Sequence, residues 1–580
     1  MCGNLRREHC GNAVVLMGWV DNRRDHGGCV FIDLRDREGI VQVVFDPSDD
    51  AAAHALAGDL RSEWVVGIRG VVRSRGGNIN PRLATGDIEI AATGIEIYAK
   101  SETPPFQISD GIETSEEVRL KYRFLDLRRG TLQRNLILRH RFNQLARKTL
   151  SDRGFLELET PFLIKSTPEG ARDYVVPSRV HQGQFFALPQ SPQLFKQLFM
   201  MAGYDRYFQL ARCFRDEDLR AERQPEFTQV DLEMSFCNEQ DVQDVTEEIL
   251  ARAWKELLNI TVPTPFERIT YDESMRRFGV DAPDLRYGLE LIDVSDLVKT
   301  SGFKVFADAA NKPGFAVKAI NITGVGELSR KDLDDYTDFV KIYGAKGMAW
   351  VRIKEDGEWQ SPIAKFLTDA ERIAMTERLA LAPGDVAVFI ADTQSVCHAS
   401  LGNLRKHVAK TRGLVDDNVY RFCWVTDFPL LEWNGEQQRF FAAHHPFTSP
   451  AASDLHKLES DPGAVKARAY DVALNGIEIG GGSIRIHDLD VQRRVFGAIG
   501  IGDVEAQAKF GFLLDALRYG APPHGGLALG IDRILMLICK TPSIRDVIAF
   551  PKTQKQTDLM LDAPSPIDIA QMLELGLRIK

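Results

Sequence analysis

The stretch RCFRDEDLRAERQPEFTQVDLE, residues 212–233, is the segment from which the fold of this chain is best interpreted. Apolar and polar residues alternate on either side of a charged loop, which predicts two β-strands with one polar face each. If the strands pair, five polar side chains share one surface: Arg215, Glu217, Gln229, Asp231 and Glu233. Guanidinium beside carboxylate suits a ligand with both an anionic and an ammonium group. A solvated face laced with salt bridges is the alternative.

The composition is that of an ordinary globular protein. The 580 residues, 44% hydrophobic and 27% charged, exceed one hydrophobic core and predict about three or four domains. The chain has no apolar run of membrane-spanning length and no signal-peptide core, so we expect a cytoplasmic location and no membrane partner. A net charge of −10 implies that any nucleic acid is bound by local patches. The eight cysteines lack metal-site spacing and are expected to be reduced thiols.

Residues 1–105 are predicted to form a small β-barrel. Strand patterns occupy 14–20, 30–34, 40–45, 65–72 and 88–98, separated by turns rich in Gly, Asp and Asn. Five strands in such a short segment favour an OB-fold. Phe31 lies near Arg23 and Arg24, an arrangement typical of a surface that stacks a nucleobase, although a core position for Phe31 is the alternative.

Thr103-Pro104-Pro105 and a hinge at 120–129 lead to a helix that includes 138–146 and ends near Gly154. A second helix is predicted to begin at Ser191-Pro192 and to bury an apolar stripe at 194, 195, 198 and 199. Gln193 and Lys196 would then lie on another face, where a lysine is usually just solvated.

Asn-Gly at 475–476 predicts a two-residue hairpin turn. Pairing position 474 with 477 places Asp471 opposite Gly480, and puts Asp471 and Glu478 diagonally on one face, about 7 Å apart. Two such carboxylates repel each other unless a cation joins them, and Mg²⁺ carried by a nucleotide is the expected cation. Ordinary surface acids are the alternative.

The stretch GGLALGIDRILML, residues 525–537, predicts a glycine-rich turn that opens an apolar helix, with Arg533 in its first turns. Such a turn is by itself a weak phosphate signal. Neither a P-loop nor a Rossmann GxGxxG occurs, so the common nucleotide folds do not compete.

In this order, the stretches resemble the class II aminoacyl-tRNA synthetases, in the form of the bacterial aspartyl enzymes. FRDEDLRAERQPEFTQ, residues 214–229, resembles motif 2; the segment up to Pro161 resembles motif 1, and 525–537 resembles motif 3. The resemblance implies an α+β, multidomain fold: an N-terminal OB-fold β-barrel, an antiparallel-sheet catalytic domain and an inserted α/β domain of GAD type. The implied limits are 1–105 for the anticodon-binding barrel, 106–284 and 419–580 for the two parts of the catalytic domain, the second with a C-terminal extension, and 285–418 for the insertion.

The resemblance further implies ATP-dependent activation of L-aspartate, with Mg²⁺, and transfer of the aspartyl group to the 3′ end of tRNA(Asp). It assigns catalysis to Arg215, Glu478 and Arg533, and Mg²⁺ binding to Asp471 and Glu478. Aspartate binding is assigned to Glu169, Ser191, Gln193, Lys196, Arg215, Gln229, Asp231, His444 and Arg485. ATP binding is assigned to Arg215, Asp216, Glu217, Gln224, Glu478, Gly530, Ile531, Asp532 and Arg533. Anticodon reading is assigned to Phe31, Gln42 and Glu89, and motif 1 implies a homodimer.

Two barrel residues bear on which tRNA is charged. His26, in RRDHGG, and Gly77, in RSRGGNIN, resemble the relaxed enzymes that also aspartylate tRNA(Asn) for later amidation, which implies a functional link to a tRNA-dependent amidotransferase. A strictly discriminating enzyme that charges only tRNA(Asp) is the alternative. Two other classes remain. An asparaginyl or lysyl enzyme would lack the Lys196 and Arg485 pair together with the insertion. A catalytically inactive tRNA-binding homologue would lose Arg215, Glu478 or Arg533.

Overall fold

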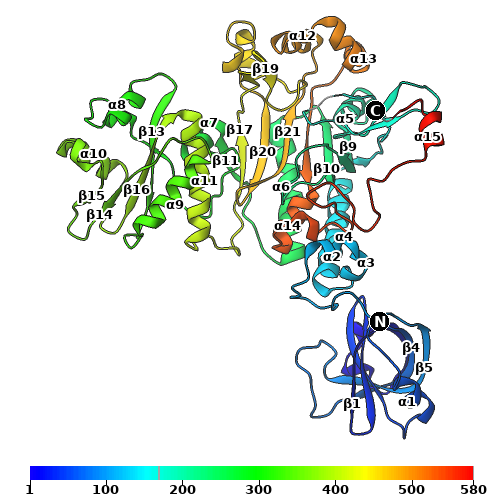
Figure 1. Ribbon diagram of the computed structural model, residues 1–580. Coiled ribbons are helices and arrows are strands. Elements are labelled where there is room, and N and C mark those ends of the chain that lie inside the picture. The colour runs from blue at the N-terminus through cyan, green and yellow to red at the C-terminus, as the bar shows by residue number, and fades with distance from the viewer. Residues whose placement is uncertain (168–169, 579–580) are drawn as a thin grey trace. The chain divides into compact units, whose positions relative to one another are not determined.

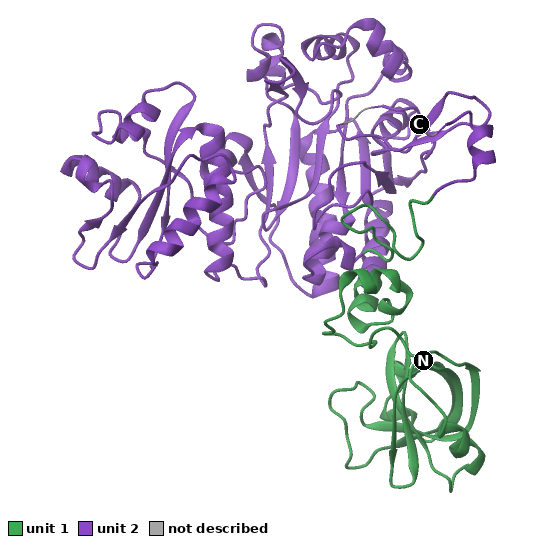
Figure 2. Cartoon of the chain, viewed as in Figure 1, with its two compact units in different colours: residues 1–137, 548–565 green, residues 138–547, 566–580 purple. Residues whose placement is uncertain are grey.

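The computed structural model describes residues 1–167 and 170–578. The chain divides into two compact units, Met1–Ile137 with Ile548–Ser565 and Leu138–Val547 with Pro566–Lys580 (Figure 2). The α+β, multidomain fold class is confirmed, whereas the finer domain limits remain predictions. Among the described residues, no helix has both the length and the apolar character needed to cross a membrane.

The first unit contains the expected barrel. Its five strands close in the order β1-β2-β3-β5-β4, with bounds β1 Ala13–His26, β2 Cys29–Asp36, β3 Gly39–Phe45, β4 Val65–Ser74 and β5 Ile88–Ala99 (Figure 1). A two-residue turn joins β1 to β2, and the positive φ of both Gly27 and Gly28 explains why glycines occupy it. Three short helices belong to the same unit: α1 Ala51–Ala57, α2 Glu116–Lys121 and α3 Arg123–Asp126. The helix α4, Gly130–Asp152, includes the predicted residues 138–146 and is followed by Gly154 with φ +78°.

The second unit is built on an eight-stranded sheet in the order β11-β17-β20-β21-β22-β10-β9-β6 (Figure 1). The bounds are β6 Leu156–Glu157, β9 Arg206–Phe214, β10 Glu226–Ser235, β11 Glu267–Thr270, β17 Phe422–Thr426, β20 Ala469–Leu474, β21 Ile477–Ile484 and β22 His524–Gly530. All neighbouring strands are antiparallel except the β11–β17 and β6–β9 pairs at the two edges. The β9–β10 hairpin predicted from residues 212–233 is confirmed.

Helices and two small hairpins complete this part of the unit. The helices are α5 Gln193–Met201, α6 Glu239–Leu258, α7 Tyr271–Phe278, α12 Leu489–Ala498, α13 Asp503–Arg518, α14 Ile531–Cys539 and α15 Ile569–Glu574; the hairpins are β7 Val175–Pro177 with β8 Phe185–Ala187 and β18 Leu431–Asn434 with β19 Arg439–Ala442. Trp424 on β17 donates its indole N–H to Glu247 of α6 at 2.9 Å. Because successive strand residues alternate between faces, Asp471, next to Val472 that pairs with Trp424, points to the face away from α6.

The inserted region forms a separate five-stranded sheet, in the order β12-β13-β16-β14-β15. Its strands are β12 Ile292–Asp293, β13 Phe315–Ile322, β14 Ala349–Ile353, β15 Trp359–Gln360 and β16 Val386–Thr393, and its helices are α8 Lys304–Ala310, α9 Arg330–Lys341, α10 Asp369–Arg378 and α11 Gln394–Thr411. Val388 and Phe389, adjacent on β16, belong to different hydrophobic clusters. Helices therefore cover both faces of this sheet, as the α/β character of the sequence predicts.

Candidate active site

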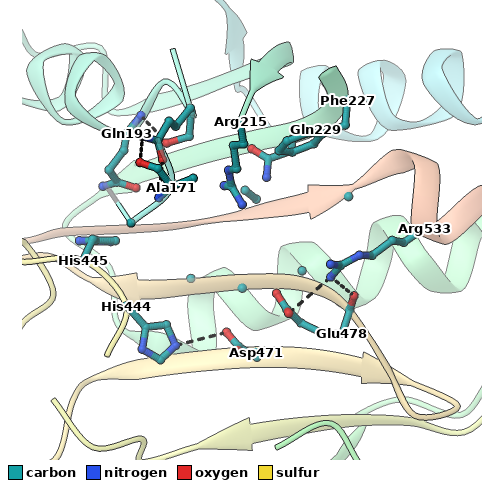
Figure 3. Close-up of a pocket in the computed structure, with 18 of the residues that line it drawn as sticks. Ala171, Gln193, Arg215, Phe227, Gln229, His444, His445, Asp471, Glu478 and Arg533 are labelled. Atoms are coloured by element: carbon teal, nitrogen blue, oxygen red, sulfur yellow. Dashed lines mark hydrogen bonds and ion pairs between the residues drawn. The ribbon is translucent and has the colours of Figure 1, made fainter. Parts of the chain in front are cut away.

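A cavity of about 840 Å³ lies on the face of the eight-stranded sheet to which Asp471 points. Strands β10, β21 and β22, the loop after β9 and the first turns of α5 and α14 supply its walls (Figure 3). The predicted residues that line it are Ser191, Gln193, Lys196, Arg215, Asp216, Glu217, Gln224, Gln229, Asp231, His444, Asp471, Glu478, Arg485, Gly530, Asp532 and Arg533. Segments more than 300 residues apart in sequence thus converge on one site.

Four charged side chains form a buried cluster at one end of the cavity. Lys196 Nζ lies 3.0 Å from Asp231 Oδ2 and 3.3 Å from Glu233 Oε2. Arg485 donates from Nε to Glu233 Oε1 at 2.9 Å and from Nη2 to Oε2 at 3.1 Å. All four are at most 2% exposed. Two cations and two carboxylates balance each other, so the cluster is neutral as it stands.

The burial of Lys196 corrects the expectation for α5. Gln193 and Lys196 are 6% and 1% exposed, whereas Phe195 and Leu198 are only partly buried. The helix also begins at Gln193, with Pro192 at the cap position and Ser191 Oγ accepting from the Gln193 amide at 3.3 Å. The polar face of α5 packs towards β10, where the carboxylates of Asp231 and Glu233 offset the cost of burying an ammonium group.

Two buried polar atoms in this region have no partner among the described residues, Oδ1 of Asp231 and Nε2 of Gln193. Unsatisfied buried polar groups are costly and mark places where a ligand supplies the missing hydrogen bonds. Burial raises the pKa of Asp231 to about 6, although Lys196 opposes the shift. Glu233 behaves differently: burial disfavours its charge, but Arg485 and Lys196 outweigh burial and hold its pKa below the ordinary value.

Arginines line the other end of the cavity. The guanidinium of Arg215 lies 5.0 Å from the ring centre of Phe227, and its buried Nε has no partner in the described part of the chain. Arg533 donates from Nη1 to the Glu478 carbonyl at 2.8 Å. Figure 3 shows Phe227 and Arg533 at the opposite end from His444 and His445. This end has the aromatic ring and the guanidinium groups that can bind the base and the phosphates of a nucleoside triphosphate.

The two predicted metal ligands lie together, but not by the expected register. A β-bulge shifts the β20–β21 pairing, so Asp471 pairs with Gly481 instead of Gly480. A Cβ at Gly481 would collide with Asp471 Oδ1 and lie 3.8 Å from Glu478 Oε1, so this glycine leaves room between the carboxylates. Burial and the charge of Asp471 raise the pKa of Glu478, against Arg533 and Arg215. Such a pair suits a cation, because Mg²⁺ in nucleotide sites is commonly bound by one or two carboxylates together with phosphate oxygens of the substrate.

His445 is a site residue that the sequence analysis did not single out. Its Nε2 lies 2.8 Å from Nη1 of Arg485. Burial, Arg485 and His444 hold the pKa of His445 well below its ordinary value, so the ring is neutral and can accept from the arginine. The neighbouring His444 points to Asp471, 3.8 Å away; burial acts against its charge, but Asp471 outweighs burial and raises its pKa. The paired histidines were the only signal in the sequence, and neither lies on a predicted strand.

Two predicted ATP-binding residues also have structural roles, and one predicted residue is not described. Ile531 is fully buried and does not line the cavity. The carboxylate of Asp532 lies at the cavity wall but binds Arg139 and accepts from the Thr228 amide at 2.9 Å, so it fixes α14 to β10. Glu169 lies outside the described residues.

The predicted anticodon residues lie outside the apolar core of the barrel, and Gln42 is only 7% exposed. Gln42 donates to Glu89 at 2.8 Å and accepts from Arg24 at 3.3 Å. Phe31 is partly exposed and does not belong to the barrel core, which removes the alternative of a core position. His26 ends β1, Gly77 lies in the loop after β4, and both are exposed.

Comparisons with known proteins agree with this geometry. Residues 115–554 match the family described as tRNA synthetases class II (D, K and N), and residues 14–98 match the OB-fold nucleic acid binding domain. The chain therefore belongs to the class II tRNA synthetases (D, K and N), and the enzyme class expected from the sequence, an aminoacyl-tRNA synthetase, is confirmed.

Curated relatives with a more specific name are similar to this chain over its full length. The aspartate–tRNA(Asp/Asn) ligase of Desulfatibacillum aliphaticivorans is 56% identical over 580 residues, which cover 100% of this chain and 97% of that protein. The enzyme of the same name from Syntrophotalea carbinolica is 55% identical over 578 residues, with the same coverage. Among solved structures, asparaginyl-tRNA synthetase from Pyrococcus horikoshii complexed with asparaginyl-adenylate has a TM-score of 0.59 at 20% identity, covering 95% of this chain and 97% of that chain, and it shows the shared fold.

Proposed function

We propose that this chain is an aspartate–tRNA ligase that charges both tRNA(Asp) and tRNA(Asn). In the first step, the α-carboxylate of aspartate attacks the α-phosphorus of ATP, and pyrophosphate leaves. In the second, a hydroxyl of the terminal ribose of the tRNA attacks the acyl carbon, and AMP leaves. The observation that carries the proposal is the buried charged cluster at one end of the cavity, where Lys196 and Arg485 lie next to the unpartnered oxygen of Asp231.

The cluster explains selectivity for aspartate. Lys196 and Arg485 would bind the side-chain carboxylate, while Ser191, Gln229 and Asp231 would receive the ammonium group. Gln193, whose unpartnered Nε2 is a hydrogen-bond donor, would bind an oxygen of the amino acid. Asparagine has nearly the same shape, so a steric fit cannot reject it. When Asp231 exchanges its contact with Lys196 for the ammonium group, the side-chain carboxylate of aspartate can take the vacated place beside the cations. A neutral amide supplies no charge for that exchange, and a site built for a charged group rejects ligands that lack it.

At the other end, positioning and charge neutralisation would drive the reaction. Arg215 would bind the α-phosphate and the substrate carboxylate, and Arg533 the γ-phosphate. Glu217, Gln224 and the backbone at Asp216 and Gly530 would hold the rest of the nucleotide. Asp471 and Glu478 would hold Mg²⁺, which supplies charge neutralisation on the phosphates. Neither step needs a protein nucleophile, because the attacking groups belong to the substrates.

The barrel would select the tRNA through Phe31, Gln42 and Glu89. Stacking on a partly exposed aromatic ring and hydrogen bonds to base edges are the usual means of reading single-stranded RNA. His26 and Gly77 support the broader specificity, in agreement with the names of the 53–56% identical relatives. A functional link to a tRNA-dependent amidotransferase follows from this proposal, because aspartyl-tRNA(Asn) must be amidated before use. A homodimer and a cytoplasmic location complete the proposal.

The test is to charge pure tRNA(Asp) and tRNA(Asn) transcripts side by side with labelled aspartate, ATP and Mg²⁺. We expect both to be aspartylated, and we expect His26→Leu to reduce charging of tRNA(Asn) more than that of tRNA(Asp). Charging of tRNA(Asp) alone would keep the ligase and reject the dual specificity. Charging of neither would contradict the proposal and favour an inactive tRNA-binding homologue.

A further inference from the structure

The β18–β19 hairpin adjoins the cavity on the side away from the nucleotide end. Glu432 of β18 lines the cavity, as do Ala443 and His444 directly after β19. Strand β18 begins five residues after β17 ends, so the hairpin projects from one end of the eight-stranded sheet (Figure 1). No role in the proposed function falls to this hairpin.

The register of the hairpin separates its side chains into two faces. Glu432 pairs with Phe441 and Asn434 with Arg439, whereas Trp433 pairs with Phe440. Directly opposed residues share a face, and successive residues alternate. Phe441 and Arg439 therefore stand on the same face as Glu432, the face that continues into the cavity, and Trp433 stands on the other.

The cavity face of the hairpin combines an aromatic ring with a cation. The guanidinium of Arg439 lies 4.2 Å from the ring centre of Phe441. Arg439 is exposed, and its guanidinium donates to the neutral Gln437 at 3.2 and 3.3 Å. Within the described ranges it has no carboxylate partner. Phe441 is partly exposed. An aromatic face for a base and an unneutralised arginine for a phosphate are the two elements of single-strand binding.

A wall of the cavity continues from this face towards the reaction centre. Tyr271 and Phe428 line the cavity with ring centres 5.2 Å apart, and Phe428 contacts the His444 ring at 4.8 Å. Burial and the nearby Glu432 raise the pKa of Tyr271, so its hydroxyl remains a hydrogen-bond donor. Aromatic rings beside a carboxylate suit a nucleobase with an amino group better than they suit a phosphate.

We propose that the cavity face of the β18–β19 hairpin receives the single-stranded 3′ end of the tRNA. The nucleotides before the last one stack on Phe441 with a phosphate on Arg439, and the terminal nucleoside passes Glu432 to lie against Tyr271 and Phe428. The inference rests on the proposed function, since it assigns a binding site to the tRNA, the substrate of the second step of that reaction. It also explains why the cavity extends beyond the aspartate and nucleotide ends.

The test compares Phe441→Ala and Arg439→Ala with Trp433→Ala, a matched variant on the opposite face of the same hairpin. Aspartate activation, measured by pyrophosphate exchange without tRNA, should stay within twofold of wild type in all three. Single-turnover transfer from enzyme-bound adenylate should fall about tenfold or more for Phe441→Ala and Arg439→Ala, as expected for loss of base stacking or a phosphate contact. Phe441→Tyr should restore transfer, and Trp433→Ala should leave it unchanged.

Binding of shortened tRNA locates the contact. Phe441→Ala should weaken binding of complete tRNA(Asp) and of tRNA lacking only its last nucleotide, but not of tRNA lacking the last three. If Phe441→Ala weakened binding of all three tRNAs equally, the contact would lie elsewhere on the tRNA and the inference would be overturned. The inference would also be overturned if Phe441→Ala transferred the aspartyl group at the wild-type rate, or if this variant lost aspartate activation. Wild-type protein that charges no tRNA would instead contradict the proposed function, so the two failures are distinguishable.

Discussion

At the residue scale, the central feature is a lysine with almost no exposed surface. Lys196 is held by Asp231 and Glu233, and Glu233 also binds Arg485. Burying ions is unfavourable unless each finds a partner. Because Asp231 keeps one unpartnered oxygen, the cluster is complete in charge but incomplete in hydrogen bonds. Such a cluster is poised to exchange contacts with an incoming zwitterion without a large rearrangement.

Lys196→Leu should abolish aspartate activation, with at least a hundredfold loss of pyrophosphate exchange, because the side-chain carboxylate of aspartate loses a cation. The variant should still fold, but with a lower unfolding temperature, since one buried partner is left uncompensated at a cost of about 3–5 kcal/mol. Lys509→Leu, at a partly exposed lysine paired with Glu505 on α13, controls for the substitution itself. Unchanged adenylate formation by Lys196→Leu would contradict the assignment of Lys196 to the side-chain carboxylate of aspartate.

The pH dependence of aspartate binding should report Asp231. Its ionised form would bind the ammonium group, so affinity measured by calorimetry without ATP should fall as pH drops through about 6. The Asp231→Asn variant should bind aspartate weakly at every pH. The His444→Gln variant should still lose affinity for aspartate as pH drops through about 6. Since the folded pKa lies above the ordinary 3.8, this carboxyl stabilises the fold below about pH 4, and that contribution is lost as pH rises through about 6. A flat affinity profile between pH 5 and 7 would contradict the assignment.

At the element scale, the bulge in the β20–β21 hairpin decides how the two acids meet. The extra residue shifts Asp471 by one position along β21, so it faces Gly481 instead of Gly480. Bulges commonly re-aim side chains next to active sites. The absence of a side chain at Gly481 is then a requirement of the site, because any Cβ there would displace the Asp471 carboxylate.

Gly481→Ala should therefore reduce aspartate activation by tenfold or more and raise the Mg²⁺ concentration needed for half-maximal rate, as the two carboxylates are pushed apart. Gly497→Ala is the matched control, because a Cβ at Gly497 in α12 meets nothing within 4 Å. That control should be neutral or stabilising by about 0.5–1 kcal/mol. Equal Mg²⁺ dependence in both variants would show that Gly481 does not separate the two acids.

At the scale of the whole molecule, each compact unit carries its own part of the proposed function. The barrel presents Phe31, Gln42 and Glu89, and the second unit contains the entire cavity. The second unit also exposes apolar side chains around its edge strand β6: Leu156, Phe162 and Leu163 are 48%, 48% and 53% exposed. Exposed apolar residues beside an open sheet edge favour association with another chain.

We expect a homodimer that buries these residues. Leu163→Asp should shift the protein to monomer at micromolar concentration in sedimentation velocity, because a charge cannot be buried unpaired in an apolar interface. Val504→Asp, at an 88% exposed position on α13, should leave the dimer intact. Monomeric wild-type protein under the same conditions would reject the dimer.

The sequence alone determined the barrel, the β9–β10 hairpin and most of the cavity lining, because alternation of apolar residues, turn signals and ordered motifs are local properties. Tertiary structure decided the rest. Periodicity placed Lys196 on a solvated face, but its actual face depends on carboxylates brought in from β10. Counting residues outward from the Asn-Gly turn could not locate the bulge that changes the pairing partner of Asp471. His445 is a functional candidate only because Arg485, forty residues later, folds against it; long-range charge pairing leaves no local pattern in the chain.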